Sequence, residues 1–189
     1  AAVFVLGGPD SANDQNEKME IELDRIKDVL REGIPYLGIC LGLQTLVKAA
    51  GGEVMKNPVR EIGFRDPEGK RFRVDLTDSG KEDELFKNLG DSFEVFHLHG
   101  ETVKTTSVMN LLGTGKYCQN QIVKVAEKAY GIQCHFELTS AMFKEWLEED
   151  EDLKTLDKNE LQKDFEEAKA NYTQVGRRLF ENFLAIAGF

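Results

Sequence analysis

The chain has 189 residues, of which 41% are hydrophobic, and this length and composition suit one globular domain with a sizeable core. Its 24 basic and 34 acidic residues leave a net charge of −10, which disfavours nucleic acid as a partner because phosphate binding depends on clustered Lys and Arg. No apolar run approaches the roughly 20 residues that span a bilayer, and three widely spaced cysteines do not make a disulfide framework, so we expect a cytoplasmic protein without membrane association.

The first third of the chain alternates between strands and helices. In chain order we predict a buried strand at 2–6, a helix that ends at Gly33, a buried strand at 34–39 and a helix at 41–50. This alternation is typical of a parallel α/β sheet with helices on both faces. The chain lacks an initiator Met and opens directly on a strand, so we expect further residues upstream in the natural protein.

The middle of the chain is richer in strands, and its last part is helical. The predicted strands are 71–76, 93–98, 121–126 and 129–136, with a short helix at 83–89. A long amphipathic helix is predicted within 161–184, after a helix that begins near 140 and a charged loop at 148–152. We therefore expect a single domain over 1–189, with 140–189 as a C-terminal helical segment packed on it.

The strongest local motif is Gly38-Ile39-Cys40-Leu41-Gly42, which lies between a predicted buried strand and a predicted helix. This layout is typical of a nucleophile elbow, a tight turn that displays one side chain at its tip. Cys40 would lie near a helix N-terminus, where the local dipole favours thiolate over thiol. The alternative is a buried structural cysteine, the commoner state of a cytosolic thiol.

A second motif is His135-Phe136-Glu137, which follows an apolar strand. Residues i and i+2 of a strand point to the same side, so Glu137 can reach the imidazole of His135 and hold its tautomer and orientation. A Cys with a distant His is the pattern of a cysteine nucleophile. The alternative is a strand-end His paired with an acid for stability.

The loop Gly7-Gly8-Pro9 ends the first predicted strand. Loops at the carboxyl ends of parallel strands gather on one edge of the sheet, where ligands bind. A glycine turn there can offer a backbone N–H to an oxyanion, with the N–H of Leu41 as its partner. An ordinary turn is the alternative.

His97 and His99 alternate on a predicted strand and resemble a pair of metal ligands. We find no third ligand with suitable spacing, so we predict structural histidines and no metal. Cys118 and Cys134 are predicted to be ordinary buried thiols.

Taken together, residues 6–9, 38–44 and 131–137 resemble the three signature segments of class I (triad) glutamine amidotransferases, in the same order and with the same spacing. The resemblance extends from Ala2 to about Thr139. Within that family, residues 96–101 and 61–63, and the long helical tail, most resemble the free-standing branch akin to the glutaminase domain of GMP synthase.

This resemblance implies a flavodoxin-like three-layer α/β sandwich with a mostly parallel central sheet, from which the family's first β-α unit is absent. It implies a glutaminase that delivers ammonia to a synthase partner and needs no cofactor. Cys40 would attack the glutamine side-chain amide, His135 would shuttle protons and Glu137 would orient the imidazole. The further residues implied are the oxyanion donors Gly8 and Leu41 and the glutamine-binding residues Gln44, Gly100 and Glu101.

Two residues depart from the family pattern, and two other functions remain as alternatives. Phe136 stands where the family commonly has Pro, and Glu101 stands where the GMP synthase type usually has Asp. A γ-glutamyl peptidase or hydrolase would use the same triad on larger γ-glutamyl compounds. A catalytically silent amidotransferase-like regulatory subunit would keep only the fold.

Overall fold

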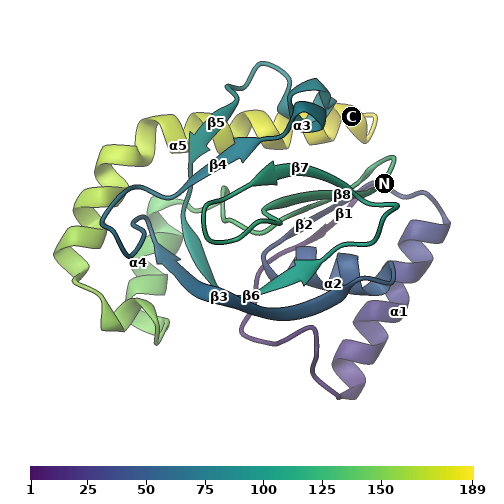
Figure 1. Ribbon diagram of the computed structural model, residues 1–189, viewed down its shortest axis with the longest axis horizontal. Helices are drawn as coiled ribbons and strands as arrows, with labels where there is room; N and C mark the ends of the chain where they lie inside the picture. Colours follow the sequence, from purple (N-terminus) through teal and green to yellow (C-terminus); the bar gives the residue numbers. More distant parts are fainter.

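A seven-stranded sheet forms the middle layer of the computed structural model, which describes residues 1–189 (Figure 1). Two of its six neighbouring strand pairs are parallel and four are antiparallel. The strand order is β1 (Val3–Val5), β2 (Tyr36–Ile39), β9 (Ala129–Ile132), β8 (Ile122–Ala126), β7 (Asn110–Thr114), β4 (Arg73–Leu76) and β5 (Ser92–Glu94).

The α/β sandwich prediction is confirmed, with a difference in the sheet. Only β1, β2 and β9 run parallel, so the sheet is mixed rather than mostly parallel. The connections explain the difference, because parallel neighbours need a long crossover whereas short turns join antiparallel ones. Helix α1 (Glu17–Arg31) crosses between β1 and β2, but only a short turn separates β8 from β9.

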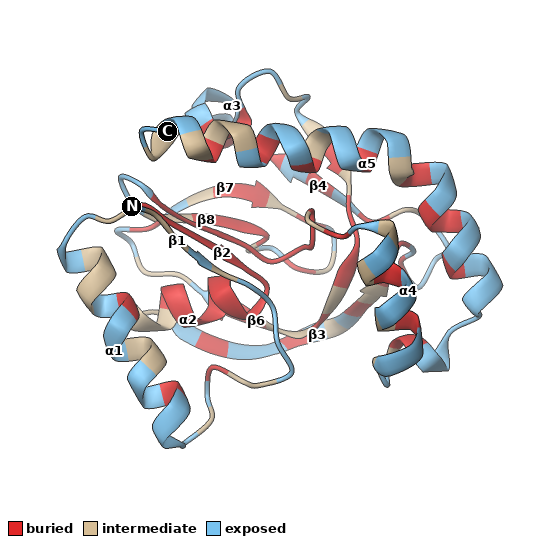
Figure 2. Ribbon diagram, turned by 180° about the vertical axis from the view of Figure 1, so that it is seen from behind, coloured by how far each residue is buried: buried red, intermediate tan, exposed pale blue.

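Helices cover both faces of the sheet. Helices α1 and α2 (Leu41–Ala49) lie on one face, and α5 (Lys158–Ile186) runs along the other with its buried side toward the strands (Figures 1 and 2). Leu179 and Phe183 of α5 join the core on that face, whereas Leu43 and Val47 of α2 pack with Val123 on the opposite face. None of the helices combines the length and the apolar composition that crossing a membrane requires.

A second, two-stranded sheet of β3 (Glu53–Gly63) and β6 (His97–Lys104) lies beside α2. The sequence pattern did not predict β3, because polar side chains interrupt its apolar ones and its register is broken by an irregularity between Lys56 and Glu61. The predicted strand at 93–98 is in fact the end of β5 and the start of β6. Strand β7 was not predicted either.

The short helices also differ in part from the prediction. The predicted helix at 83–89 is a single 3₁₀ turn, Glu84–Phe86, and it follows a short helix α3 (Asp78–Glu82). Helix α4 (Ser140–Glu149) and α5 are separated by a second 3₁₀ turn at Leu153–Thr155, so the predicted break near 148–152 is close to the observed one.

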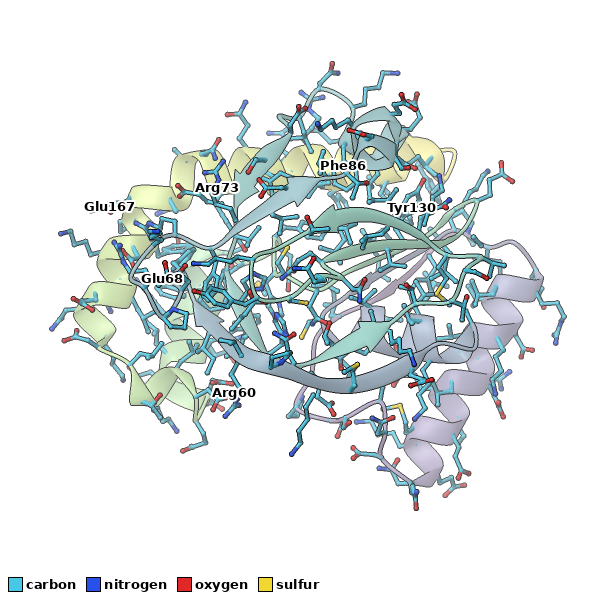
Figure 3. The ribbon with its side chains drawn as sticks, in the orientation of Figure 1. Arg60, Glu68, Arg73, Phe86, Tyr130 and Glu167 are labelled. Carbon is cyan, nitrogen blue, oxygen red and sulfur yellow. The ribbon has the colours of Figure 1, made fainter.

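An ion-pair cluster fastens α5 to the segment between β3 and β4. The buried carboxylate of Asp164 accepts from Arg65 Nε at 2.7 Å and from Arg65 Nη2 at 2.6 Å, and Arg71 Nη2 lies 3.1 Å away. Arg71 also donates to Glu167 at 2.8 Å. In Figure 3 Glu167 marks this stretch of α5, and Glu68 marks the facing loop.

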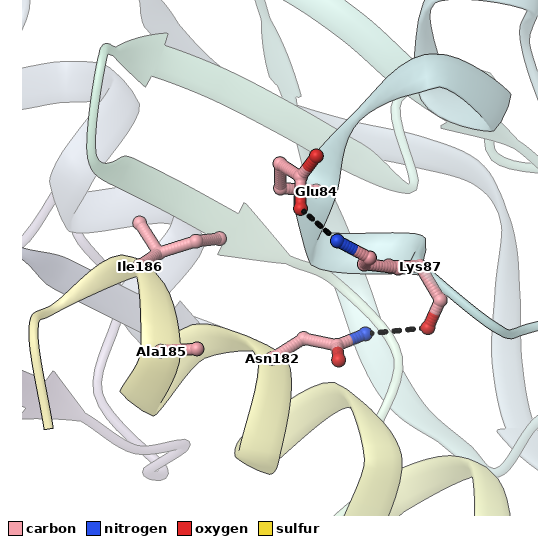
Figure 4. Close-up of a pocket in the computed structure, with 5 residues that line it drawn as sticks. All are labelled: Glu84, Lys87, Asn182, Ala185 and Ile186. Atoms are coloured by element: carbon pink, nitrogen blue, oxygen red, sulfur yellow. Dashed lines mark hydrogen bonds and ion pairs between the residues drawn. The ribbon is translucent and has the colours of Figure 1, made fainter.

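The far end of α5 is held by an amide. Asn182 Nδ2 donates to the carbonyl oxygens of Leu85 and Lys87, each at 2.9 Å. A cavity of about 270 Å³ lies beside this contact, lined by Glu84, Lys87, Asn182, Ala185 and Ile186 (Figure 4). None of the predicted site residues lines it.

We expect Asp164→Asn to lower the free energy of unfolding by about 1.5–3 kcal/mol, because it weakens buried hydrogen bonds to charged groups. Urea denaturation measures the change. Glu166→Gln on the same helix is the matched control and should stay within about 0.5 kcal/mol, because its carboxylate is exposed and pairs only with Lys169. Equal losses in the two variants would contradict the anchoring role.

Candidate functional site

Cys40 lies at the tip of a strained turn between β2 and α2. Its backbone has φ 54° and ψ −105°, in the left-handed region that non-glycine residues rarely adopt. A Cβ on Gly38 would lie 2.2 Å from the carbonyl oxygen of Gly42, and a Cβ on Gly42 would lie 2.1 Å from that of Val5. Both flanking glycines are therefore required for three backbone segments to meet here.

Hydrogen bonds from neighbouring strands hold this turn in place. The backbone N–H of Cys40 donates to the carbonyl oxygen of Ile132 at the end of β9, at 2.8 Å. The hydroxyl of Tyr36, in β2, donates to the carbonyl oxygen of Gly42 at 2.9 Å. Cys40 Sγ lies 3.8 Å from the carbonyl oxygen of Leu98, so β6 forms one wall beside the sulfur.

His135 and Glu137 follow the carboxyl end of β9, the strand next to β2. The imidazole Nδ1 of His135 and Oε1 of Glu137 are 2.8 Å apart, and the backbone N–H of Phe136 donates to Oε2 of the same carboxylate at 2.9 Å. A carboxylate only accepts, so Nδ1 carries the proton. The backbone N–H of His135 donates to Phe96 at 2.9 Å, which ties this segment to the start of β6.

The loop after β1 lies against both Cys40 and His135. A Cβ placed on Gly7 would lie 3.4 Å from Cys40 Cβ and 3.8 Å from His135 Nε2. The Gly7 backbone is therefore within van der Waals reach of both Cys40 and His135. The three parallel strands thus bring together the thiol, the imidazole and the acid that the sequence singled out.

His135 and Glu137 stabilise each other in their charged forms. Burial by itself lowers the pKa of His135, but the negative charge of Glu137, the hydrogen bond that the ring donates to it and the neighbouring Cys40 sulfur outweigh burial and raise that pKa to about 10. Burial raises the pKa of Glu137, but the neighbouring His135 outweighs it and leaves the pKa below its ordinary 4.5. Near neutral pH the pair is an imidazolium beside a carboxylate.

Helices α4 and α5 support the imidazole from outside the sheet, which the sequence did not indicate. The Trp146 ring lies edge-on to the His135 ring with centroids 5.0 Å apart. The Tyr172 hydroxyl donates to the carbonyl oxygen of His135 at 2.7 Å. A Cβ on Gly176 would lie 2.1 Å from the carbonyl oxygen of Phe136, so α5 touches this segment backbone to backbone. The one signal for Gly176 was a glycine inside a long helical pattern.

The predicted oxyanion residues lie next to each other. A Cβ on Gly8 would be 3.3 Å from Leu41 Cδ2. Leu41 is the first residue of α2, and the N–H groups of a first helical turn have no partner within the helix. Gly8 is exposed in the loop after β1.

The predicted glutamine-binding residues lie on and against β6. Gln44 Nε2 donates to the carbonyl oxygen of Glu101 at 3.2 Å, so its amide binds this strand. The Glu101 carboxylate accepts from Ser11 Oγ at 2.7 Å, which joins β6 to the loop after β1. Gly100 lies under the Arg60 side chain, whose Nε would be 3.1 Å from a Cβ at that position.

The fold gives the two histidines neighbours that the sequence did not reveal. We found no third ligand for His97 and His99, yet the fold places Glu61 of β3 and Cys118 beside His99. The spacing of the sequence hid these residues because β3 was not recognised as the partner of β6. The burial of Cys118 and Cys134 is confirmed.

The sequence profile of the family described as "Glutamine amidotransferase class-I" matches residues 1–152. The chain belongs to this family. Among relatives, the chain is 30% identical over 142 residues to the glutamine amidotransferase-like protein YfeJ of Salmonella typhimurium, covering 72% of this chain and 56% of YfeJ. It is 30% identical over 139 residues to a glutamine-hydrolysing GMP synthase of Neisseria meningitidis, covering 72% of this chain and 24% of that protein.

The fold of the chain agrees with a solved structure. A glutamine amidotransferase from Thermotoga maritima superposes with a TM-score of 0.80 at 28% identity, covering 95% of this chain and 77% of that one. The chain thus spans about half of YfeJ and about a quarter of the GMP synthase.

We expect Gly176→Ala to lower the free energy of unfolding of the protein by about 1–3 kcal/mol. Alanine gains about 1 kcal/mol of helix propensity, but a methyl group 2.1 Å from a carbonyl oxygen forces α5 to move. Thermal and urea unfolding measure the balance. Gly90→Ala is the control, because the nearest atom to its added Cβ is 3.8 Å away. A more stable Gly176→Ala protein would show that α5 does not press on this segment.

The stabilisation from His135 and Glu137 should depend on pH. The raised pKa of His135 means that its contribution is complete below its ordinary 6.5 and is lost as the pH rises toward about 10. The lowered pKa of Glu137 means that its contribution is present above 4.5 and is lost as the pH falls below that value. The stability difference between the wild type and a His135→Gln, Glu137→Gln double variant should therefore be largest between pH 4.5 and 6.5. Urea denaturation of both proteins, measured from below pH 4.5 up to pH 10, tests this prediction. A stability difference that stays constant up to pH 10 would contradict it.

Proposed function

We propose that the chain hydrolyses the side-chain amide of glutamine through a thioester on Cys40 and delivers the ammonia to a synthase partner. The observation that carries this proposal is the convergence of Cys40, His135 and Glu137 at the carboxyl ends of adjacent parallel strands, in a chain of the class-I glutamine amidotransferase family.

In the first half of the reaction the thiolate of Cys40 attacks the amide carbon of glutamine. The imidazolium of His135 gives its proton to the departing nitrogen, the C–N bond breaks, and ammonia leaves a γ-glutamyl thioester on Cys40. The resident imidazolium fits this role, because it stabilises a neighbouring thiolate and already carries the proton that the leaving group needs.

In the second half water attacks the thioester. The now neutral His135 takes a proton from that water at Nε2, the C–S bond breaks, and glutamate leaves while Cys40 returns to the thiolate. Glu137 holds Nδ1 throughout, so the other ring nitrogen faces the reaction. The positive charge that forms on the ring in each cycle is stabilised by the same carboxylate.

Further residues are proposed to bind the substrate and the oxyanion. The N–H groups of Gly8 and Leu41 are the oxyanion donors in the proposal, supported by the contact between these residues at the start of α2. Glu101 and Gly100 would line the glutamine pocket through the backbone of β6. Gln44 would act on the same pocket by holding the carbonyl of Glu101.

The synthase partner is inferred from the likeness to glutamine-hydrolysing GMP synthases, of which this chain matches about a quarter. Ammonia diffuses freely, so a glutaminase of this kind is useful when an acceptor enzyme is bound to it. We expect the reaction to take place in the cytoplasm and to need no cofactor.

We expect Cys40→Ala to lower the rate of ammonia release from glutamine by about 10³-fold or more, because it removes the nucleophile. Glu137→Gln should lower kcat by about 10²-fold or more through loss of imidazole orientation. Its matched control is Glu127→Gln in the exposed turn between β8 and β9, which should leave the rate unchanged. Ammonia is measured by a coupled assay.

The same assay with γ-glutamyl peptides separates the alternatives. Cleavage of these peptides with little turnover of glutamine would replace the proposal with a γ-glutamyl peptidase or hydrolase. Equal background rates in wild type and Cys40→Ala on every substrate, with and without a captured synthase, would leave a silent regulatory subunit.

A further inference from the structure

A second group of reactive side chains lies inside the protein, apart from the triad. Glu61 of β3, His99 of β6 and Cys118 after β7 are all buried, and one donor atom from each lies within 4.8 Å of the others. These are a carboxylate oxygen, an imidazole nitrogen and a thiol sulfur. The three come from separate parts of the chain, so only the tertiary fold brings them together.

The carboxylate of Glu61 has no cationic Lys or Arg partner. Its side chain is 1% exposed, and its ion-pair contacts are with His99 Nε2 at 2.9 Å and His97 Nε2 at 3.9 Å. Gln121 Nε2 donates to the same oxygen at 3.0 Å. A buried carboxylate is costly unless a positive charge compensates it, and one neutral amide donor does not supply that charge.

The imidazole ring of His99 faces this carboxylate. His99 Nδ1 lies 2.9 Å from the backbone oxygen of Glu101, which only accepts, so Nδ1 carries the proton. The other ring nitrogen, Nε2, lies 2.9 Å from Glu61 Oε2 without hydrogen-bond geometry. An imidazole nitrogen and a carboxylate oxygen that face each other in this way can both be ligands of one cation.

Other polar atoms around Glu61 also lack hydrogen bonds. His97 Nδ1 and Gln121 Oε1 are buried without a partner, in addition to His99 Nε2. Buried polar atoms are nearly always satisfied in native proteins, and each exception costs about 1–3 kcal/mol. All three exceptions belong to residues that contact or approach the Glu61 carboxylate, which indicates that the cluster can take an additional ligand.

We propose that Glu61, His99 and Cys118 bind a structural Zn²⁺ ion. Thiolate, imidazole and carboxylate are zinc ligands, whereas Mg²⁺ and Ca²⁺ prefer oxygen donors alone. The bond from His99 Nδ1–H to a backbone carbonyl is the outer-shell contact that orients metal-binding histidines. Binding would release the Cys118 thiol proton to solvent. His97 or water would supply a fourth ligand.

Such an ion would link the two-stranded sheet to the central sheet, next to the strand that borders the candidate active site. Glu61 and His99 belong to the two-stranded sheet, and Cys118 belongs to the turn between β7 and β8 of the central sheet. β6 also carries Leu98, whose carbonyl oxygen faces Cys40, and Glu101, which binds Gln44. The ion would therefore hold the strand that forms the wall of the site without touching the reacting atoms.

The test uses the full chain carrying Cys40→Ala, so that neither the nucleophile nor the proposed activity contributes to the result. We expect about one zinc ion per chain after purification, measured by mass spectrometry. Replacement by Co²⁺ should give a sulfur-to-cobalt charge-transfer band. Adding Cys118→Ser should abolish the band and weaken Zn²⁺ binding by more than the roughly 10–100-fold that loss of an outer-shell partner costs.

Cys134→Ser in the same background is the matched control, because this buried thiol is outside the cluster and should leave both signals intact. If Cys118→Ser fails to fold, Glu61→Gln provides a second variant, which keeps an acceptor but removes the charge and should also lose the metal. A folded Cys40→Ala protein that takes up neither Zn²⁺ nor Co²⁺ would overturn the proposal. So would a cobalt–thiolate band that survives Cys118→Ser.

Discussion

Close backbone contact around Cys40 is the constraint from which the rest of the site follows. The turn after β2 passes so near to the backbone of β1, and to its own first helical turn, that neither flanking glycine has room for a Cβ. The left-handed backbone of Cys40 is sustained by those neighbours and by the bond from its N–H to Ile132. Because β1, β2 and β9 run parallel, their carboxyl ends present the Gly7 loop, Cys40 and the His135 segment to the same space.

The imidazole needs more support than the sheet alone provides. His135 lies beyond the end of β9, so its backbone is held by Phe96 on one side and by the Tyr172 hydroxyl of α5 on the other. Helix α5 can approach closely only at Gly176, and the ion pairs of Asp164 set its position along the sheet. The position of the His135 imidazole therefore depends on how α5 packs, and the ion pairs of Asp164 hold α5 in place.

Strand β6 links the two clusters of reactive side chains. Its backbone carbonyls contact the sulfur of Cys40 and the side-chain amide of Gln44. Its His99 side chain contacts Glu61 in the protein interior. The Ser11–Glu101 bond adds the loop after β1 to the same strand. A displacement of β6 would therefore alter the wall of the candidate site even though none of its side chains belongs to the triad.

Short-range patterns in the sequence were sufficient to predict the elbow at Cys40, the closeness of His135 to Glu137 and a strand near 71–76, observed as β4 at Arg73–Leu76. Strand periodicity, glycine spacing and helix ends depend on neighbours a few residues away. The mixed direction of the sheet, the pairing of β3 with β6 and the contact of Gly176 with Phe136 depend on which distant segments pack together. Glu61, His99 and Cys118 come together for the same reason. They belong to β3, β6 and the turn after β7, which become neighbours only when the chain packs, so no local sequence pattern predicts their contact.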